Sequence, residues 1–206
     1  EDYYKESKEK NISIHELLLR KSVDQEPGQH GLLALDWLNG NRSVLMNSDL
    51  SGVLVGLTLN TKPEDIYRAM IEATAFGTRV IIENFEKNGI KVEEIYACGG
   101  LVNNSMLLQI YSDITGKTIK VAASAQTTAL GAAILGVMAA GLECEGFSTI
   151  ENVIAKMTMP PQAVYQSNQG NHSGYKNLYE KYIQLHDYFG RGKPVVMKEL
   201  KFYPDK

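Results

Sequence analysis

The sequence predicts an α/β fold with a partly parallel sheet. Apolar segments of strand length alternate with helical segments between residues 53 and 141, which is the pattern of βαβ units. A long amphipathic helix is predicted over residues 62–87, and a strand, a glycine pair and a second helix follow over residues 95–116. These observations place one α/β layer in the middle of the chain.

Residues 1–30 read as a polar lead-in, which we expect to continue from upstream sequence. One short helix is predicted from Ser13 to about Lys21. Ser13 and Glu16 have the spacing of a capping box, in which each side chain accepts a backbone N–H of the other residue. The lead-in is therefore expected to hold little regular structure beyond this helix.

Two strands are predicted before the long helix, over residues 31–38 and 53–59, because both segments are apolar and of strand length. The helix over residues 62–87 is expected to begin with a second capping box, formed by Thr61 and Glu64. An Asn-Gly pair directly after this helix is expected to end it.

The central motif is a strand over residues 95–98 that runs into Gly99 and Gly100, with Asn103 and Asn104 opening the next helix. Backbone N–H groups at a helix N-terminus point outward, and a glycine lets a ligand approach them closely. A strand, a glycine turn and a helix also occur where nothing is bound. The residues alone therefore leave a binding role and a purely structural role open.

The second half of the chain continues the alternation. A strand is predicted over residues 118–122, and a helix rich in small side chains over residues 127–141 is expected to pack closely against a neighbour. Residues 142–170 are expected to be irregular, and a closing helix is predicted over residues 174–189 with its tyrosines on a packed face. Residues 191–206 are interpreted as a peripheral tail.

Composition excludes several classes of protein. The chain has 206 residues, a formal net charge of -3 and a pI near 5.9, which argues against nucleic acid as a partner. No apolar run approaches the roughly 18 residues that a membrane span needs. Cys98 and Cys144 form no CxxC pair, so we expect a reduced, cytoplasmic protein.

The sequence shows no complete catalytic constellation. It contains no P-loop and no His or Cys pair at metal-binding spacing, and we expect no metal ligand and no catalytic base in this chain. Asp36, at a predicted strand end, is the one carboxylate placed to face a cleft; a hydrogen-bonded turn aspartate and a weak substrate candidate are both open readings. The histidines are expected on the surface: His15, His30, His172 and His186.

Several motifs, in the right order, resemble the FGGY family of carbohydrate kinases. Residues 52–57 and 65–72 match the family's second signature, and residues 99–116 look like its adenosine motif. Residues 127–136 look like the alanine-rich helix that follows that motif. The resemblance covers residues 31–190, and the segments LLALDWLNGNRS and ATAFGTR are most similar to the L-ribulokinase branch.

The resemblance implies a ribonuclease-H-like domain, as in actin, sugar kinases and heat-shock chaperone ATPases, with a mixed sheet flanked by helices. Residues 31–190 would be the C-terminal nucleotide-binding domain, with residues 1–30 as a lead-in and residues 191–206 as a tail. The parent protein would phosphorylate a ketopentose with ATP and Mg²⁺. The first choice is L-ribulose, converted to L-ribulose 5-phosphate in arabinose catabolism. D-ribulose and xylulose stay open.

The resemblance also implies roles for individual residues. Gly99, Gly100 and Leu101 would line the adenine and ribose with their backbone, and Asn104 would hydrogen-bond the nucleoside, with Asn103 as a second choice. Many members of the family have a third glycine and an alanine where Leu101 and Val102 stand here. This departure affects the expected shape of the pocket but not its expected location. The catalytic aspartate would lie in the missing N-terminal part.

The implied partners are the missing N-terminal kinase domain and, through the whole enzyme, the ketopentose, with a homodimer left open. This chain alone is expected to catalyse nothing, because closure of two domains completes such a site. Apolar residues near the glycine pair should then form an exposed patch. The alternative reading is a non-catalytic actin-like nucleotide-binding or regulatory module, and a third is a structural α/β domain without a ligand.

Overall fold

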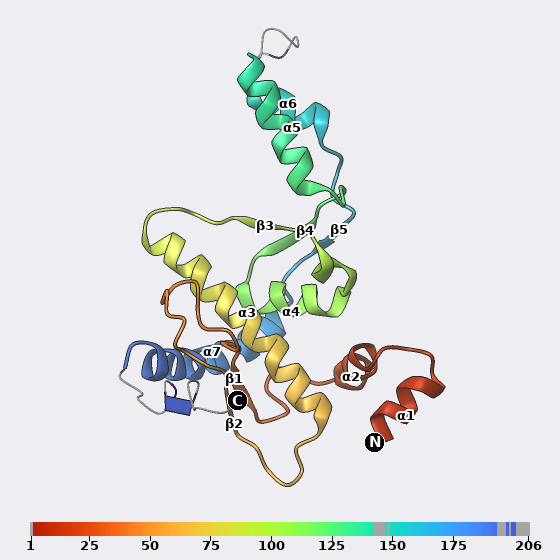
Figure 1. Cartoon of the computed structure of the whole chain (residues 1–206), viewed down its shortest axis with the longest axis vertical. Coiled ribbons are helices and arrows are strands. Elements are labelled where there is room, and N and C mark those ends of the chain that lie inside the picture. The colour runs from red at the N-terminus through yellow and green to blue at the C-terminus, as the bar shows by residue number, and fades with distance from the viewer. Residues whose placement is uncertain (1, 142–146, 148, 193–196, 198, 201–206) are drawn as a thin grey trace.

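The computed structural model describes residues 2–141, 147, 149–192, 197 and 199–200. Figure 1 shows a body of helices packed around two small sheets, from which a helical arm rises. Most of the predicted tail lies outside the described residues, as does Cys144.

Two helices make up the lead-in, α1 (Asp2–Glu9) and α2 (Ile14–Ser22). The structure confirms the predicted helix, since the hydroxyl of Ser13 caps α2 by accepting a backbone N–H at 3.1 Å. Helix α1 was not predicted, because its polar sequence carries no apolar stripe. It is tied to the body by the Tyr3 hydroxyl, which donates to Glu64 Oε2 at 2.7 Å.

The long helix α3 (Pro63–Lys87) matches its prediction, but its first turn is capped differently. The Lys62 N–H donates to Asp65 Oδ2 at 2.8 Å. The hydroxyl of Thr61 instead accepts a backbone N–H of the preceding turn, and Glu64 bonds α1. The predicted Thr61–Glu64 capping box is therefore wrong, because Asp65, one position after Glu64, accepts the backbone N–H at the start of the helix.

The first sheet pairs β1 (Leu33–Leu35) with β2 (Val53–Val55) in antiparallel register. Both strands are shorter than the predicted 31–38 and 53–59. Gly56 has φ +101°, a backbone conformation that ends the extended run of β2.

The second sheet is mixed, which confirms the predicted fold class. Strand β3 (Glu94–Ala97) runs parallel to β4 (Thr118–Val121), with α4 (Ser105–Thr115) as the crossover between them. Strand β5 (Ala163–Tyr165) pairs antiparallel with the other side of β4. Because β5 is so short, it was missed in the stretch 142–170 that was expected to be irregular.

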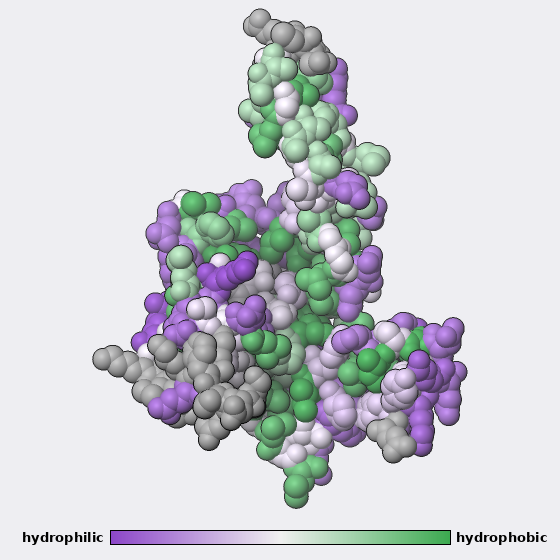
Figure 2. Space-filling model, in the orientation of Figure 1, coloured by the Kyte–Doolittle hydropathy of each residue, from purple (hydrophilic) through white to green (hydrophobic). Residues whose placement is uncertain are grey.

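The arm consists of α5 (Thr127–Ala140) and α6 (Ile150–Met157), which lie side by side (Figure 1). Helix α6 also lies in the stretch predicted as irregular; it is short and begins at Thr149, whose hydroxyl accepts a backbone N–H. Helix α5 was predicted, but none of its residues is buried. Its small side chains therefore do not pack closely against the body, and apolar colour covers much of the arm in Figure 2.

The closing helix α7 (Gln169–Gly190) begins before the predicted Gly174, because Asn168 Oδ1 accepts two backbone N–H groups of its first turn. Three tyrosines of α7, Tyr175, Tyr179 and Tyr182, form a packed face against α3, as predicted. The largest fully buried side chains of the body include Tyr175, Tyr182, Phe76, Leu17, Leu35, Ile114 and Ile119.

Candidate functional site

The glycine pair forms the turn that the sequence predicts. Strand β3 ends at Ala97, Gly99 takes φ +85° and ψ -162°, and a 3-10 turn over Gly100–Asn103 leads into α4. This combination of angles is open almost only to glycine. A Cβ added at Gly99 or Gly100 would meet no atom within 4 Å. The backbone of the turn is therefore open to a ligand.

Asn104 links the turn to α4. Its Oδ1 accepts the N–H of Leu107 at 3.0 Å, so the side chain caps the helix. The same residue was predicted to hydrogen-bond a nucleoside. With its oxygen used by the cap, the Nδ2 amide is the part of this side chain that can donate to a ligand.

A cavity of about 660 Å³ lies between the glycine turn and α2. This volume is in the usual range for small-molecule sites, about 300–1,000 Å³. Of the predicted site residues, the cavity brings together Gly100, Asn103 and Asn104. Gly99 and Leu101 do not line it; Gly99 shapes the turn, and Leu101 is 59% exposed.

The other wall of the cavity was missed in the sequence. Helix α2 and its N-cap contribute Ser13, Glu16 and Arg20, and Tyr67 of α3 adds an aromatic ring. The three residues of α2 and its N-cap recur at i, i+3 and i+7, so they share one face of the helix, which was the available signal. The sequence instead suggested a lead-in outside the domain.

Polar and aromatic groups of this wall suit a planar, polar ligand. The rings of His15 and Tyr67 lie 5.9 Å apart, and partial burial raises the pKa of the Tyr67 hydroxyl above its usual value. Arg20 Nη2 and Glu16 Oε1 are 2.5 Å apart on the solvent side. Exposed ion pairs of this kind contribute little to stability, so both charges can turn toward a ligand at small cost.

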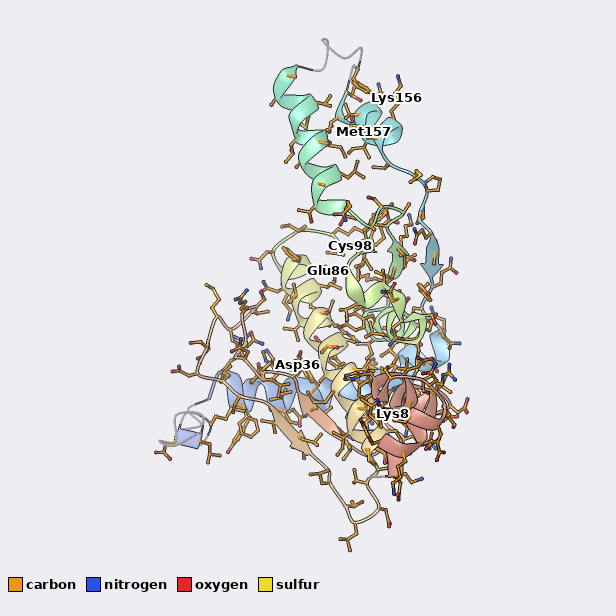
Figure 3. The ribbon with its side chains drawn as sticks, turned by 45° about the vertical axis from the view of Figure 1, so that its right-hand side comes forward. Lys8, Asp36, Glu86, Cys98, Lys156 and Met157 are labelled. Atoms are coloured by element: carbon orange, nitrogen blue, oxygen red, sulfur yellow. The ribbon has the colours of Figure 1, made fainter. Side chains whose placement is uncertain are left out.

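Asp36 lines a second cavity of about 350 Å³, which shares no lining residue with the first. It lies at the end of β1 beside α3 (Figure 3), and Thr74, Gly77 and Tyr111 are among its neighbours in this cavity. Burial raises the pKa of the Asp36 carboxyl. The structure therefore does not bring Asp36 together with the glycine turn.

The prediction that the histidines lie on the surface is wrong for two of them. The side chain of His30 is fully buried and faces Glu72, and that of His186 is 2% exposed against Trp37. Within the described ranges, no three His, Cys, Asp or Glu side chains gather as a metal site would require. No helix in the described part of the chain is long and apolar enough to span a membrane.

The fold is an α/β domain of the ribonuclease-H-like class, and it carries a cavity at its strand–glycine–helix turn. Residues 3–140 match the C-terminal domain of the FGGY family of carbohydrate kinases, and the chain belongs to that family.

Curated relatives can be aligned with this chain over nearly its whole length. A ribulokinase of Halalkalibacterium halodurans is 51% identical over 199 residues, which is 96% of this chain and 35% of the relative. A ribulokinase of Geobacillus thermodenitrificans is 50% identical over 205 residues, 98% of this chain and 36% of the relative. The chain thus spans about a third of the length of the curated relatives it matches.

Solved structures confirm the fold. A ligand-bound xylulose kinase from Lactobacillus acidophilus superposes with a TM-score of 0.76 at 23% identity, covering 88% of this chain and 36% of that one. Plasmodium falciparum glycerol kinase with ADP gives a TM-score of 0.62 at 24% identity, covering 82% of this chain and 35% of the other.

Proposed function

We propose that this chain is the nucleotide-holding C-terminal part of an ATP-dependent ketopentose kinase that converts L-ribulose to L-ribulose 5-phosphate. The observation that carries the proposal is the match to ribulokinases at about half identity along 96% or more of the chain. The cavity at the glycine turn supports the proposal, because its volume is in the range of small-molecule sites. No observation favours the alternative of a non-catalytic module.

The nucleoside is proposed to lie in the cavity between α2 and the glycine turn. The backbone of Gly100 would border the adenine and ribose, whereas Gly99 and Leu101, which do not line the cavity, would act through the shape of the turn. The Asn104 amide would donate to the nucleoside, with Asn103 as the second choice. The volume of the cavity and the open space over Gly100 both fit such a ligand. In this role the chain binds and orients, which is most of what a protein contributes to phosphoryl transfer.

Mg²⁺ is part of the proposal as the ion that accompanies the phosphates of ATP, where it neutralises negative charge. Magnesium is usually held by one or two carboxylates together with phosphate oxygens and water. We propose that its protein ligands and the catalytic aspartate belong to the N-terminal domain, so that the present chain alone transfers no phosphate.

That N-terminal domain is the proposed partner. Helix α5 has no charged residue and no buried one, and Leu135 on it is 64% exposed. Near the glycine turn, Tyr96 and Leu101 are 61% and 59% exposed. An apolar helix is normally covered by other parts of the protein. We propose that the N-terminal domain, which corresponds to the other two thirds of the ribulokinase relatives, covers α5. Cys98 is an exposed free thiol, which supports the proposed cytoplasmic location.

The proposal is tested by calorimetric titration of ADP into the chain and into Gly100→Val. Gly100 lines the cavity and a Cβ added there meets no atom within 4 Å, so we expect the native chain to bind ADP and the valine variant to lose binding while keeping its fold. Gly136→Val is the matched control, since it places the same side chain into open space on the arm.

Equal binding by all three proteins would refute the glycine-turn site. Absence of ADP binding by the native chain, both alone and after the upstream kinase domain is added, would refute the nucleotide role. Light scattering on the same samples would decide whether the chain forms a homodimer.

A further inference from the structure

Four separate segments of the chain meet in one buried polar network. Arg68 Nε donates to Glu72 Oε1 at 2.8 Å, and Arg68 Nη2 donates to the Tyr175 hydroxyl at 2.8 Å. That hydroxyl donates in turn to Glu72 Oε1 at 2.9 Å, which closes a triangle between α3 and α7. Glu72 Oε2 lies 3.1 Å from His30 Nε2. The fourth segment is the end of α2, whose Ser22 carbonyl accepts from Arg68 Nη1 at 3.3 Å.

The positive charge of Arg68 is paired with the negative charge of Glu72 inside this network. Burial by itself raises the pKa of Glu72, but the hydrogen bonds from His30 and Arg68, together with the positive charge of Arg68, more than offset it and hold that pKa below its usual value. The His30 Nδ1 accepts the N–H of Leu32 at 3.0 Å, which leaves the proton on Nε2, directed at Glu72. A buried ion pair adds little net stability, but removing one partner is costly.

The network lies next to the wall of the cavity at the glycine turn. Arg68 follows Tyr67, which lines the cavity, and it bonds the last residue of α2. Arg68, Glu72 and Tyr175 are 5%, 2% and 1% exposed, so water does not compete for their bonds. We propose that the Arg68–Glu72–Tyr175–His30 network is a positioning device that holds α2 at the distance from the glycine turn that the nucleotide requires. The effect on nucleotide binding rests on the proposed function; the anchoring of α2 does not.

Two pairs of variants test the device. Tyr175→Phe deletes the hydroxyl of the network, whereas Tyr182→Phe deletes a hydroxyl of another fully buried α7 tyrosine that has no hydrogen-bond partner among the described residues. In Arg68→Lys, the single ammonium group cannot replace the three guanidinium nitrogens that bond Glu72, Tyr175 and the Ser22 carbonyl. Arg79→Lys is its control on the same helix, because Arg79 also bonds a glutamate one turn on and the carbonyl of Ile114, away from the cavity.

The first readout is amide hydrogen exchange. We expect α2 to exchange about tenfold faster in Tyr175→Phe and in Arg68→Lys, as for the loss of a hydrogen bond to a charged group, and to be unchanged in both controls. The second readout is the Kd for ADP. It should rise about fivefold in the two network variants, the lower end of coupling between sites, and stay constant in the controls.

Equal α2 exchange in a network variant and its control would overturn the anchoring. Faster exchange with an unchanged Kd would overturn the link to the nucleotide. If the native chain binds no ADP even with the upstream domain, the proposed function fails, and the exchange rates still decide whether the network holds α2.

Discussion

Replacing Gly99 by alanine tests whether the glycine turn is conformationally strained or merely flexible. The angles φ +85° and ψ -162° fall in a region that is essentially closed to residues with a Cβ. Holding alanine there should cost about 1–3 kcal/mol. For a chain of this size each kcal/mol lowers the melting temperature by about 2–4 °C, so a loss of about 2–12 °C is expected.

The neighbouring Gly100→Ala is the control for this experiment. The added Cβ at Gly100 meets nothing within 4 Å, and its φ is not in the left-handed region. Alanine there restricts the unfolded chain without straining the folded one, so its stability should change by less than about 1 kcal/mol. Thermal unfolding followed by circular dichroism measures both. Equal melting temperatures for the two variants would refute the argument that Gly99 is required for its backbone angles.

Three further predictions concern other parts of the chain. Asn104→Ala should lower the free energy of unfolding by about 1 kcal/mol through loss of the α4 cap, while Asn104→Asp keeps the cap; urea unfolding that ranks them equal would contradict the capping role. The pKa of Asp36 is raised, so its burial penalty is absent at low pH and grows as pH rises above about 3.9, the unfolded value; Asp36→Asn should therefore gain melting temperature relative to the native chain between about pH 4 and 7, and a constant difference would argue against it. Leu135→Glu should change the stability of this chain by no more than about 0.5 kcal/mol yet weaken its association with the upstream kinase domain in a pull-down, and undiminished association would exclude α5 from that interface.

Local signals in the sequence predicted much of the fold. The glycine pair predicted the turn between β3 and α4, Ser13 marked the start of α2, and the apolar periodicity of α3 predicted its length. These features depend on residues a few positions apart, so periodicity and capping rules reach them. Helix α6 was missed because it is short and lacks a long periodic pattern.

The network of Arg68, Glu72, Tyr175 and His30 lay beyond such rules. Its partners are as far apart as 107 positions in the sequence, and two charged residues in a helix read as an exposed pair unless their tertiary neighbours are known. For the same reason α2 was not predicted to form a wall of the cavity. The glycine turn could be predicted from the sequence, whereas the opposite wall depends on how distant segments pack.

The uncovered helix α5 bears on how the proposed kinase is made. Domains fold as units during synthesis, the N-terminal one first. In the proposed parent protein, the upstream domain is therefore complete before residues 127–140 leave the ribosome, and the uncharged helix meets its partner surface as it emerges. Produced by itself, the present chain lacks that order of events. We therefore expect the isolated chain to aggregate unless chaperones are present or its concentration is low.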